Sequence, residues 1–218
     1  ILKLNLTGSA GQSLGAFLSK SIKIKLSGDA NDYVAKGLSG GTIIVNLSKD
    51  NKLKTNENTI IGNTVLYGAT SGKLFAAGKA GERFAVRNSG AISVVEGCDA
   101  NGCEYMTGGE IVILGKIGDN FAAGMTGGIA FIYDPDNTFE NFVNPTSVVW
   151  QKPETEYWKE RLKTLITEYD RETESKISEH ILKNFTKKIK NFKQVCPIEM
   201  LDKLKHPVGF KIKKNLAS

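Results

Sequence analysis

Few residues in this sequence could act as a nucleophile with a base beside it. Ser13 lies in Gly11-Gln-Ser-Leu-Gly15, which matches the G-x-S-x-G pattern that carries the nucleophile of α/β-hydrolases. That chemistry needs a strand-to-helix turn around the serine and a histidine that accepts its proton. The two histidines, His180 and His206, both lie after residue 150. We therefore expect Ser13 to occupy a turn, and an independent hydrolase is only a formal alternative.

Metal and phosphate sites are also poorly supported. Cys98 and Cys103 are separated by four residues, and Cys196 stands alone. A zinc or iron–sulfur site needs three or four ligands at suitable spacing, and the sequence has no second ligand pair. It also lacks a P-loop and a G-x-G-x-x-G motif between a strand and a helix. We therefore expect no catalytic, cofactor-binding or metal-binding residue in this chain, and reduced thiols.

The most suggestive polar cluster lies in the segment Gly81–Gly90. Arg83, Arg87 and Asn88 alternate there with apolar residues, so all three are expected to point outward. Two arginines on one face could bind the carboxylates of a neighbouring domain, because the guanidinium group matches a carboxylate with two parallel hydrogen bonds. A solvated surface is the alternative interpretation.

The elements that hold these residues form a repeat. Short apolar strands, each preceded by a glycine, are predicted at residues 42–45, 73–76, 91–94, 110–113 and 129–132. The steps between their first residues are 31, 18, 19 and 19, and the long step contains a polar insertion, Ser48–Asn58. Alternating apolar residues at 2, 4 and 6 and at 22, 24 and 26 extend the repeat to the N-terminus.

A period near 19 residues is too short for helical repeats and favours a β-solenoid, in which equivalent apolar side chains stack from rung to rung. Here a rung means one full turn of the solenoid. Glycine is expected at the corners, where the backbone needs a positive φ or a close approach. The sequence thus predicts an all-β, single-stranded solenoid of about seven rungs. An antiparallel sandwich or barrel with glycine-rich hairpins is the alternative.

The composition changes near residue 150, which predicts a glycine-rich β domain at 1–150 and a helical, lysine-rich tail at 151–218. Residues 1–128 hold 22 of the 23 glycines, and the net charge of +6 belongs entirely to the tail. The tail could contact an acidic partner, whereas a solvated end is the simpler interpretation. No known nucleic-acid motif is present, so nucleic acid is not an expected partner.

Two helices are expected in the tail. The first starts near Glu154 and has one apolar face, formed by Trp158, Leu162, Leu165, Ile166 and Tyr169. The second repeats apolar residues every four positions, at Ile177, Ile181, Phe185 and Ile189, with Thr173 or Ser175 as its N-cap.

No apolar run is long enough for a membrane span, and no signal peptide precedes the first predicted strand. The chain is therefore expected to be cytoplasmic, without a membrane partner. It opens on Ile1 inside that strand, which suggests a fragment of a longer protein.

Six glycine-rich segments carry a family likeness. They are Gly8–Phe17, Gly28–Gly41, Ile61–Thr70, Gly81–Gly90, Gly102–Gly109 and Asn120–Gly128. With them, the chain from about Leu6 to Phe192 resembles the C-terminal GXGXG domain of the glutamate synthase large subunit. The resemblance implies a right-handed β-helix. It also implies a parent enzyme that makes L-glutamate from L-glutamine and 2-oxoglutarate with FMN, an iron–sulfur cluster and an electron donor, none of them held by residues of this chain.

Two hypotheses follow from this resemblance. The first is a structural domain that braces the amidotransferase and FMN-binding synthase domains of the parent chain, with a small electron-transfer subunit as a further candidate partner. The alternative is a free-standing β-helix subunit of another redox complex, such as formylmethanofuran dehydrogenase. The helical pair after Pro153 favours the first hypothesis.

Overall fold

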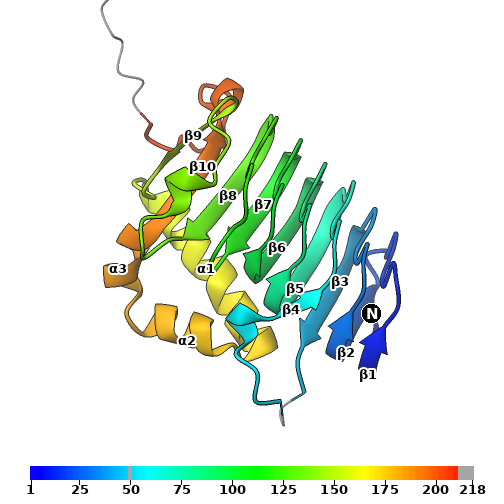
Figure 1. The fold of residues 1–218 in the computed structure, drawn as a ribbon. Coiled ribbons are helices and arrows are strands. Elements are labelled where there is room, and N and C mark those ends of the chain that lie inside the picture. The colour runs from blue at the N-terminus through cyan, green and yellow to red at the C-terminus, as the bar shows by residue number, and fades with distance from the viewer. Residues whose placement is uncertain (49–50, 211–218) are drawn as a thin grey trace, which may run out of the picture.

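The computed structural model describes residues 1–48 and 51–210, and its main element is one long sheet of parallel strands (Figure 1). The strands are β1 (Leu2–Ala10), β2 (Ile22–Ala30), β3 (Ser39–Asn46), β5 (Ser71–Ala80), β6 (Ser89–Cys98), β7 (Thr107–Ile113) and β8 (Gly127–Tyr133). They lie side by side in that order, and every neighbouring pair is parallel. Each predicted strand is confirmed as part of a longer one.

Each of these strands is one side of a solenoid rung. The chain leaves a strand, crosses back through an irregular segment and enters the next strand in parallel with the last, which gives a right-handed β-helix of about seven turns. The prediction of a β-helix with a small helical tail is confirmed. The sandwich alternative is wrong, because hairpins would have made neighbouring strands antiparallel.

The predicted polar insertion, Ser48–Asn58, lies between strands β3 and β4, outside the stacked rungs. Residues 49–50 of it lie outside the described residues, and the remainder contains a short 3₁₀-helix, η1 (Thr55–Glu57). The chain then forms β4 (Thr59–Ile61), which pairs with both β2 and β5. The insertion therefore returns the chain to the same solenoid.

The interior of the solenoid is a column of stacked apolar side chains. Leu26, Val45, Ala76, Val95 and Ile113 occupy equivalent positions on five successive strands of the sheet, and all are buried. Residues of the irregular segments close the other side of this core. Stacking equivalent side chains is what allows a rung to bury its apolar face.

The outer face of the same strands is buried as well, under helix α1 (Glu156–Thr173). The outward column is Ile44, Phe75, Val94, Val112 and Phe131. The helix covers it with the predicted apolar face: Trp158, Leu162, Leu165, Ile166 and Tyr169 are all buried. Burial on both faces explains why the strands read as nearly continuous apolar runs.

The rest of the tail returns to the sheet. Ser175 caps α2 (Lys176–Lys183) by accepting hydrogen bonds from two backbone N–H groups. The expectation of one second helix reaching Ile189 is wrong, because Asn184 leaves the helical conformation and separates α2 from α3 (Phe185–Lys188) and η3 (Ile189–Asn191). The four-residue spacing continues across the break, which is why the sequence suggested one helix.

A reversed pair of strands ends the sheet. Strand β10 (Phe192–Pro197) pairs antiparallel with β8 and with β9 (Val148–Gln151). Two short 3₁₀-helices, η2 (Phe139–Asn141) and η4 (Ile198–Met200), flank this pair in the chain. The division at 150/151 stays a prediction, and in the structure it falls within β9.

Candidate interaction surface

The irregular segments opposite the sheet share an unusual backbone, and we call this side of the solenoid the turn face. Positive φ values recur there in triplets at alternate residues: 13/15/17, 33/35/37, 64/66/68, 83/85/87, 101/103/105 and 120/122/124. Most of these residues are not glycine, so the sequence prediction that glycine supplies the positive φ values of the corners was incomplete. Each non-glycine residue in this conformation costs about 1–2 kcal/mol.

Hydrogen bonds between rungs offset this strain. In the triplet 83/85/87, the N–H of Arg83 donates to Ala100 O at 2.8 Å, and that of Arg87 donates to Glu104 O at 3.0 Å. The N–H of the middle residue, Ala85, points the other way and donates to Val65 O at 2.9 Å. The backbone under both arginines is therefore fixed by its neighbours on both sides.

The alternation also sorts the side chains. The middle residues of five triplets are completely buried: Ala35, Leu66, Ala85, Cys103 and Ala122. Arg83 and Arg87, the first and third residues of their triplet, are exposed as predicted. Neither guanidinium has a hydrogen bond or an ion pair to any residue that the structure describes, so both are available to a partner.

Asn88 does not join them, and the prediction that it points outward is wrong. Its side chain is completely buried; Nδ2 donates to Ala91 O at 3.0 Å and to Gly108 O at 3.2 Å, and Oδ1 accepts from Ala91 N–H at 3.0 Å. The chain bends into β6 directly after the triplet, so the in-out alternation is not maintained. Asn88 is a structural residue that links two rungs.

Two aromatic side chains extend the exposed surface of the turn face. Phe17 is 67% exposed and Tyr105 is 54% exposed. Each ring lies against a glycine of the next rung, since an added Cβ at Gly37 or Gly124 would be 2.5 Å from ring atoms. One face of each ring is thus supported and the other is free. Tyrosine and arginine are enriched in protein interfaces, which makes this the best candidate interaction surface.

The other residues singled out from the sequence are dispersed. Ser13 is the exposed first residue of the first triplet, and its N–H donates to Asp32 O. His180 lies on α2, whereas His206 stacks on Tyr157 with ring centroids 3.6 Å apart. The structure thus brings neither histidine onto the turn face with Ser13.

All three cysteines are buried, which affects their chemistry. Burial raises the pKa of Cys98 to about 12 and that of Cys196 to about 11, and it raises the pKa of Cys103 well above the ordinary value. These thiols therefore stay protonated near neutral pH and are poor nucleophiles. In residues 1–48 and 51–210, no three His, Cys, Asp or Glu side chains come together as a metal site.

The backbone beneath the two arginines also does not suit a phosphate group. A phosphate cradle requires free backbone N–H groups, and in the triplet 83/85/87 all three are already bonded to neighbouring rungs. This triplet therefore offers no free backbone N–H group to a phosphate.

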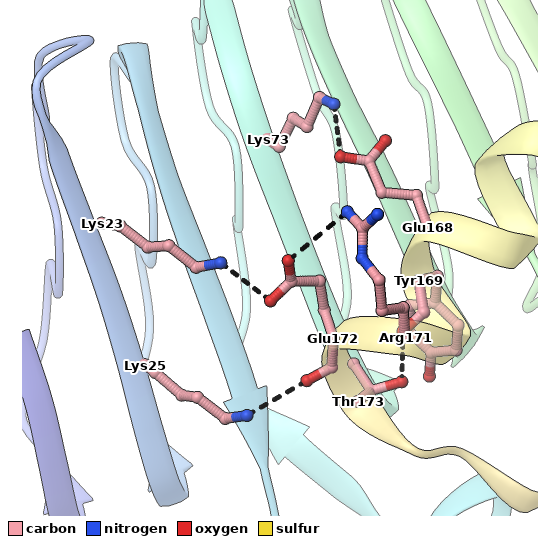
Figure 2. A network of polar contacts seen from close by, with 8 residues as sticks. All are labelled: Lys23, Lys25, Lys73, Glu168, Tyr169, Arg171, Glu172 and Thr173. Carbon is pink, nitrogen blue, oxygen red and sulfur yellow. Dashed lines mark hydrogen bonds and ion pairs between the residues drawn. The ribbon is translucent and has the colours of Figure 1, made fainter. Parts of the chain in front are cut away.

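Helix α1 is fastened to the sheet by ion pairs that sequence reasoning missed. Lys23, Lys73 and Glu110 lie in one column of the outer face, as the strand register shows. They pair with Glu172 at 2.8 Å, with Glu168 at 2.5 Å and with Arg161 at 2.6 Å, respectively. Figure 2 shows the first two of these pairs. Opposite charges at one repeat position and on one helix face were the signal in the sequence.

The spacing of these pairs explains how the helix lies. From Arg161 to Glu172 an α-helix rises about 16 Å, and the four strand spacings from β7 to β2 span about 19 Å. The helix therefore runs along the solenoid axis. Lys25 Nζ also donates to Glu172 O at 3.3 Å, which satisfies a carbonyl at the end of the helix (Figure 2).

A buried carboxylate holds the junction between α1 and α2. Glu96 is completely buried, and its Oε1 accepts from Tyr169 Oη at 3.0 Å and from Ser175 Oγ at 2.5 Å. Its Oε2 has no hydrogen-bond partner among the described residues. Burial and the Glu96 charge raise the pKa of Tyr169 well above its ordinary value, so the phenol remains a donor.

Lysines of the tail fold back onto the solenoid. Lys188 Nζ lies 5.9 Å from the centroid of the Tyr133 ring, and Lys193 Nζ lies 4.0 Å from Asp134 Oδ2. A cleft of about 820 Å³ lies beside them and is lined in part by Lys116. The three lysines at 211, 213 and 214 lie outside the described residues. Some of the tail's excess charge is therefore already engaged within the chain.

The fold and the turn face define a glycine-rich β-helix whose exposed features suit contacts with a partner. The GXGXG motif family model matches residues 1–198, and the chain belongs to that family. None of the helices described is long and apolar enough to cross a membrane.

Its relatives include parts of much longer enzymes. The chain is 58% identical over 207 residues to the glutamate synthase [NADPH] large chain of Azospirillum brasilense, a match that covers 95% of this chain and 14% of the relative. It is 51% identical to the ferredoxin-dependent glutamate synthase of Antithamnion sp., covering 90% and 13%. For the glutamate synthase [NADPH] large chain of Bacillus subtilis the identity is 47%, with coverage of 90% and 13%. The chain thus spans about one seventh of the length of these relatives.

Proposed function

We propose that this chain is the structural β-helix domain of a glutamate synthase and that it braces the amidotransferase and FMN-binding synthase domains against each other. The parent enzyme would make L-glutamate from L-glutamine and 2-oxoglutarate in the cytoplasm. FMN and the iron–sulfur cluster would belong to the other domains, and a small electron-transfer subunit is a further candidate partner. The glutamate synthase relatives support this role over that of a free-standing subunit of another redox complex.

The observation that carries the proposal is the state of Arg83 and Arg87. Both are exposed, both stand on backbone fixed by hydrogen bonds between rungs, and neither guanidinium has a partner among the described residues. Because the backbone is already fixed, only the two side chains need to be ordered on binding, and a guanidinium group can bind a carboxylate of another domain with two parallel hydrogen bonds. The exposed ring of Tyr105 adds an apolar contact beside them.

The expected contribution is positional. Ammonia released at the amidotransferase site must reach the synthase site without escaping, and this requires that the two domains stay in register. A solenoid is a suitable brace because each rung is fixed by its neighbours along a long, flat face. We expect the purified 218-residue chain to be colourless and inactive toward glutamine and esters. A yellow protein, or an esterase activity lost in Ser13→Ala, would contradict this expectation.

The test is charge reversal in the full-length enzyme with Arg83→Glu and Arg87→Glu. Glutamine hydrolysis, glutamate formation from added ammonia and the coupled reaction would be measured separately, together with FMN content. We expect the coupled rate to fall at least tenfold relative to the two half-reactions, with FMN retained. Lys163→Glu is the matched control, because Lys163 is an exposed cation on the solvent side of α1.

Two results would refute the bracing role. The first is a coupled rate in both arginine variants that equals the rate of the Lys163 control. The second is loss of FMN from a stably folded variant, with glutamate formation from added ammonia falling as far as the coupled rate, which would place the turn face at the cofactor site instead.

A further inference from the structure

The cleft of about 820 Å³ beside α2 lies at the edge of the sheet where β5, β7 and β8 end (Figure 1). Its walls come from the chain after β7, from η2, from η1 of the insertion and from α2. Its floor is formed by buried apolar side chains: Leu114, Ile117, Ile132 and Phe139. None of the triplet residues of the turn face lines it. A concave site with an apolar floor is where a ligand or a partner segment is expected to bind.

Most charged groups around this cleft already have a partner within the chain. The ion pairs are Lys79–Asp99 at 2.9 Å, Lys54–Glu57 at 3.2 Å and Lys193–Asp134 at 4.0 Å. Of the three carboxylates that line the cleft, only Asp136 has no cationic partner among the described residues. The paired groups shape the walls of the cleft and leave little negative charge free.

Three lysines around the cleft have no carboxylate partner in the part of the chain that the structure describes, and we call Lys116, Lys176 and Lys188 the rim lysines. Lys116 follows β7 and Lys176 is the first residue of α2; both are exposed, and neither ammonium group has a hydrogen bond or an ion pair to a described residue. Lys188 ends α3, and its ammonium group contacts the His180 ring and, at 3.5 Å, the Tyr133 hydroxyl. The unpaired charge around the cleft is therefore positive.

An apolar floor inside a rim of separated cations suits a peptide segment in which carboxylates flank an apolar side chain. Burial of the apolar side chain supplies affinity, and the rim lysines select and orient the acidic flanks. The end of this chain does not match, because residues 211–218 contain three lysines and neither Asp nor Glu. A second copy with its cleft facing this one would bring the same lysines together, which like-charge repulsion opposes.

We propose that an acidic segment of another domain of the parent chain, outside this sequence, docks in the cleft. Its apolar side chain covers the floor, and its carboxylates pair with the rim lysines. This inference rests on the proposed function, which supplies the longer chain. The contact holds the solenoid to its neighbours at a second place, so that it does not pivot about the turn face alone.

Zero-length cross-linking with a water-soluble carbodiimide tests this contact, because the reagent joins an amine to a carboxylate only where the two groups already touch. The full-length enzyme and the 218-residue chain would be treated alike, and cross-linked peptides would be identified by mass spectrometry. We expect the rim lysines to be joined in the full-length enzyme to Asp or Glu residues outside this sequence, with a yield about tenfold that of Lys163, an exposed lysine on the solvent side of α1. The Lys23–Glu172 pair, at 2.8 Å, should be cross-linked in both proteins.

Charge reversal tests the role of the lysines. Lys116→Glu combined with Lys176→Glu should lower the yield of the Lys188 cross-link about fivefold, because the two new carboxylates repel the acidic segment. Both positions are exposed and unpaired, so the double variant should keep the melting temperature of the wild type. Lys163→Glu is the matched control and should leave the Lys188 cross-link unchanged. An unchanged Lys188 cross-link in the double variant would overturn the proposal.

Two further results would overturn it. The first is that the rim lysines of the full-length enzyme form no cross-links, or only cross-links to carboxylates within residues 1–218. The second is cross-links to another copy, identified by mixing isotope-labelled and unlabelled enzyme. Neither result depends on coupling between the half-reactions. Normal coupling in the arginine variants together with the expected cross-links would refute bracing through the turn face and leave this proposal standing, and uncoupled arginine variants without these cross-links would do the reverse.

Discussion

A substitution at Gly109 tests whether the close stacking of rungs decides the stability of this fold. Gly109 has a φ of +90°, and an added Cβ would lie 2.3 Å from Ala91 O and 2.6 Å from Asn88 Nδ2. The first contact is with backbone of the neighbouring rung, so β6 or β7 must shift. The second displaces the buried amide of Asn88, which makes three hydrogen bonds.

The expected magnitude for Gly109→Ala follows from these contacts. The positive φ costs about 1–2 kcal/mol, and disturbing a buried hydrogen-bonded amide costs about 1–3 kcal/mol. We therefore expect a loss of about 3 kcal/mol or more in the free energy of unfolding. For a chain of this size that lowers the melting temperature by roughly 6–12 °C. Gly109→Val should lower it further, because its branched side chain adds two methyl groups to the same contacts.

Two other glycines separate the causes. Gly68 has a φ of +63° and open space where a Cβ would be, so Gly68→Ala should cost only about 1 kcal/mol. Gly11 has open space and no positive φ, so Gly11→Ala should leave stability nearly unchanged. Thermal and urea unfolding, followed by circular dichroism, would rank the three. If Gly109→Ala melts no lower than Gly68→Ala, the argument from rung packing is refuted.

Three further predictions concern buried groups and the α1 contacts. Burial raises the pKa of all three thiols, so the protonated thiols stabilise the folded chain below about pH 9. The free energy of unfolding should fall as the pH rises through the raised pKa values. A constant free energy of unfolding between pH 8 and 11 would contradict this. Burial alone would raise the pKa of Glu172, but the hydrogen bond from Lys23 and the Lys23 charge bring it below the ordinary value. The Lys23–Glu172 pair should therefore stabilise the folded chain above about pH 4.5 and lose this effect as the pH falls. Glu172→Lys should lower the free energy of unfolding by about 0.5–1 kcal/mol, and adding Lys23→Glu should restore most of that loss. If the double variant is no more stable than Glu172→Lys, the contact contributes nothing. Tyr169→Phe removes a hydrogen-bond donor from the buried Glu96 and should lower the free energy of unfolding, measured in urea, by about 1–3 kcal/mol. Tyr157→Phe is the control and should lower it little, because the Tyr157 side chain is 42% exposed. Equal effects of the two substitutions would refute the role of this hydrogen bond.

Local patterns in the sequence were sufficient for the repeat and for α1. The glycine-preceded strands and the apolar face from Trp158 to Tyr169 were both predicted and are both present. They could be predicted because burial imposes a period of two on strands and 3.6 on helices, whatever the distant parts of the chain do. An N-cap at Thr173 or Ser175 follows from the same kind of local rule, and in the structure Ser175 is the cap, whereas Thr173 is the last residue of α1.

Asn88 shows where such rules fail. Its neighbours suggested an outward side chain, yet its partners are Ala91 and the backbone of Gly108, 20 residues away. Strand β10 was missed for a similar reason, because its pairing partners β8 and β9 lie far back in the chain. No local period reports contacts of this range.

The sequence by itself determined that this protein is a solenoid with a helical tail, since the repeat length and the placement of apolar residues follow from burial within each rung. Only the tertiary structure decided what each surface offers. The stacking of rungs holds non-glycine residues such as Arg83 at positive φ, because hydrogen bonds to the rungs on either side offset the strain.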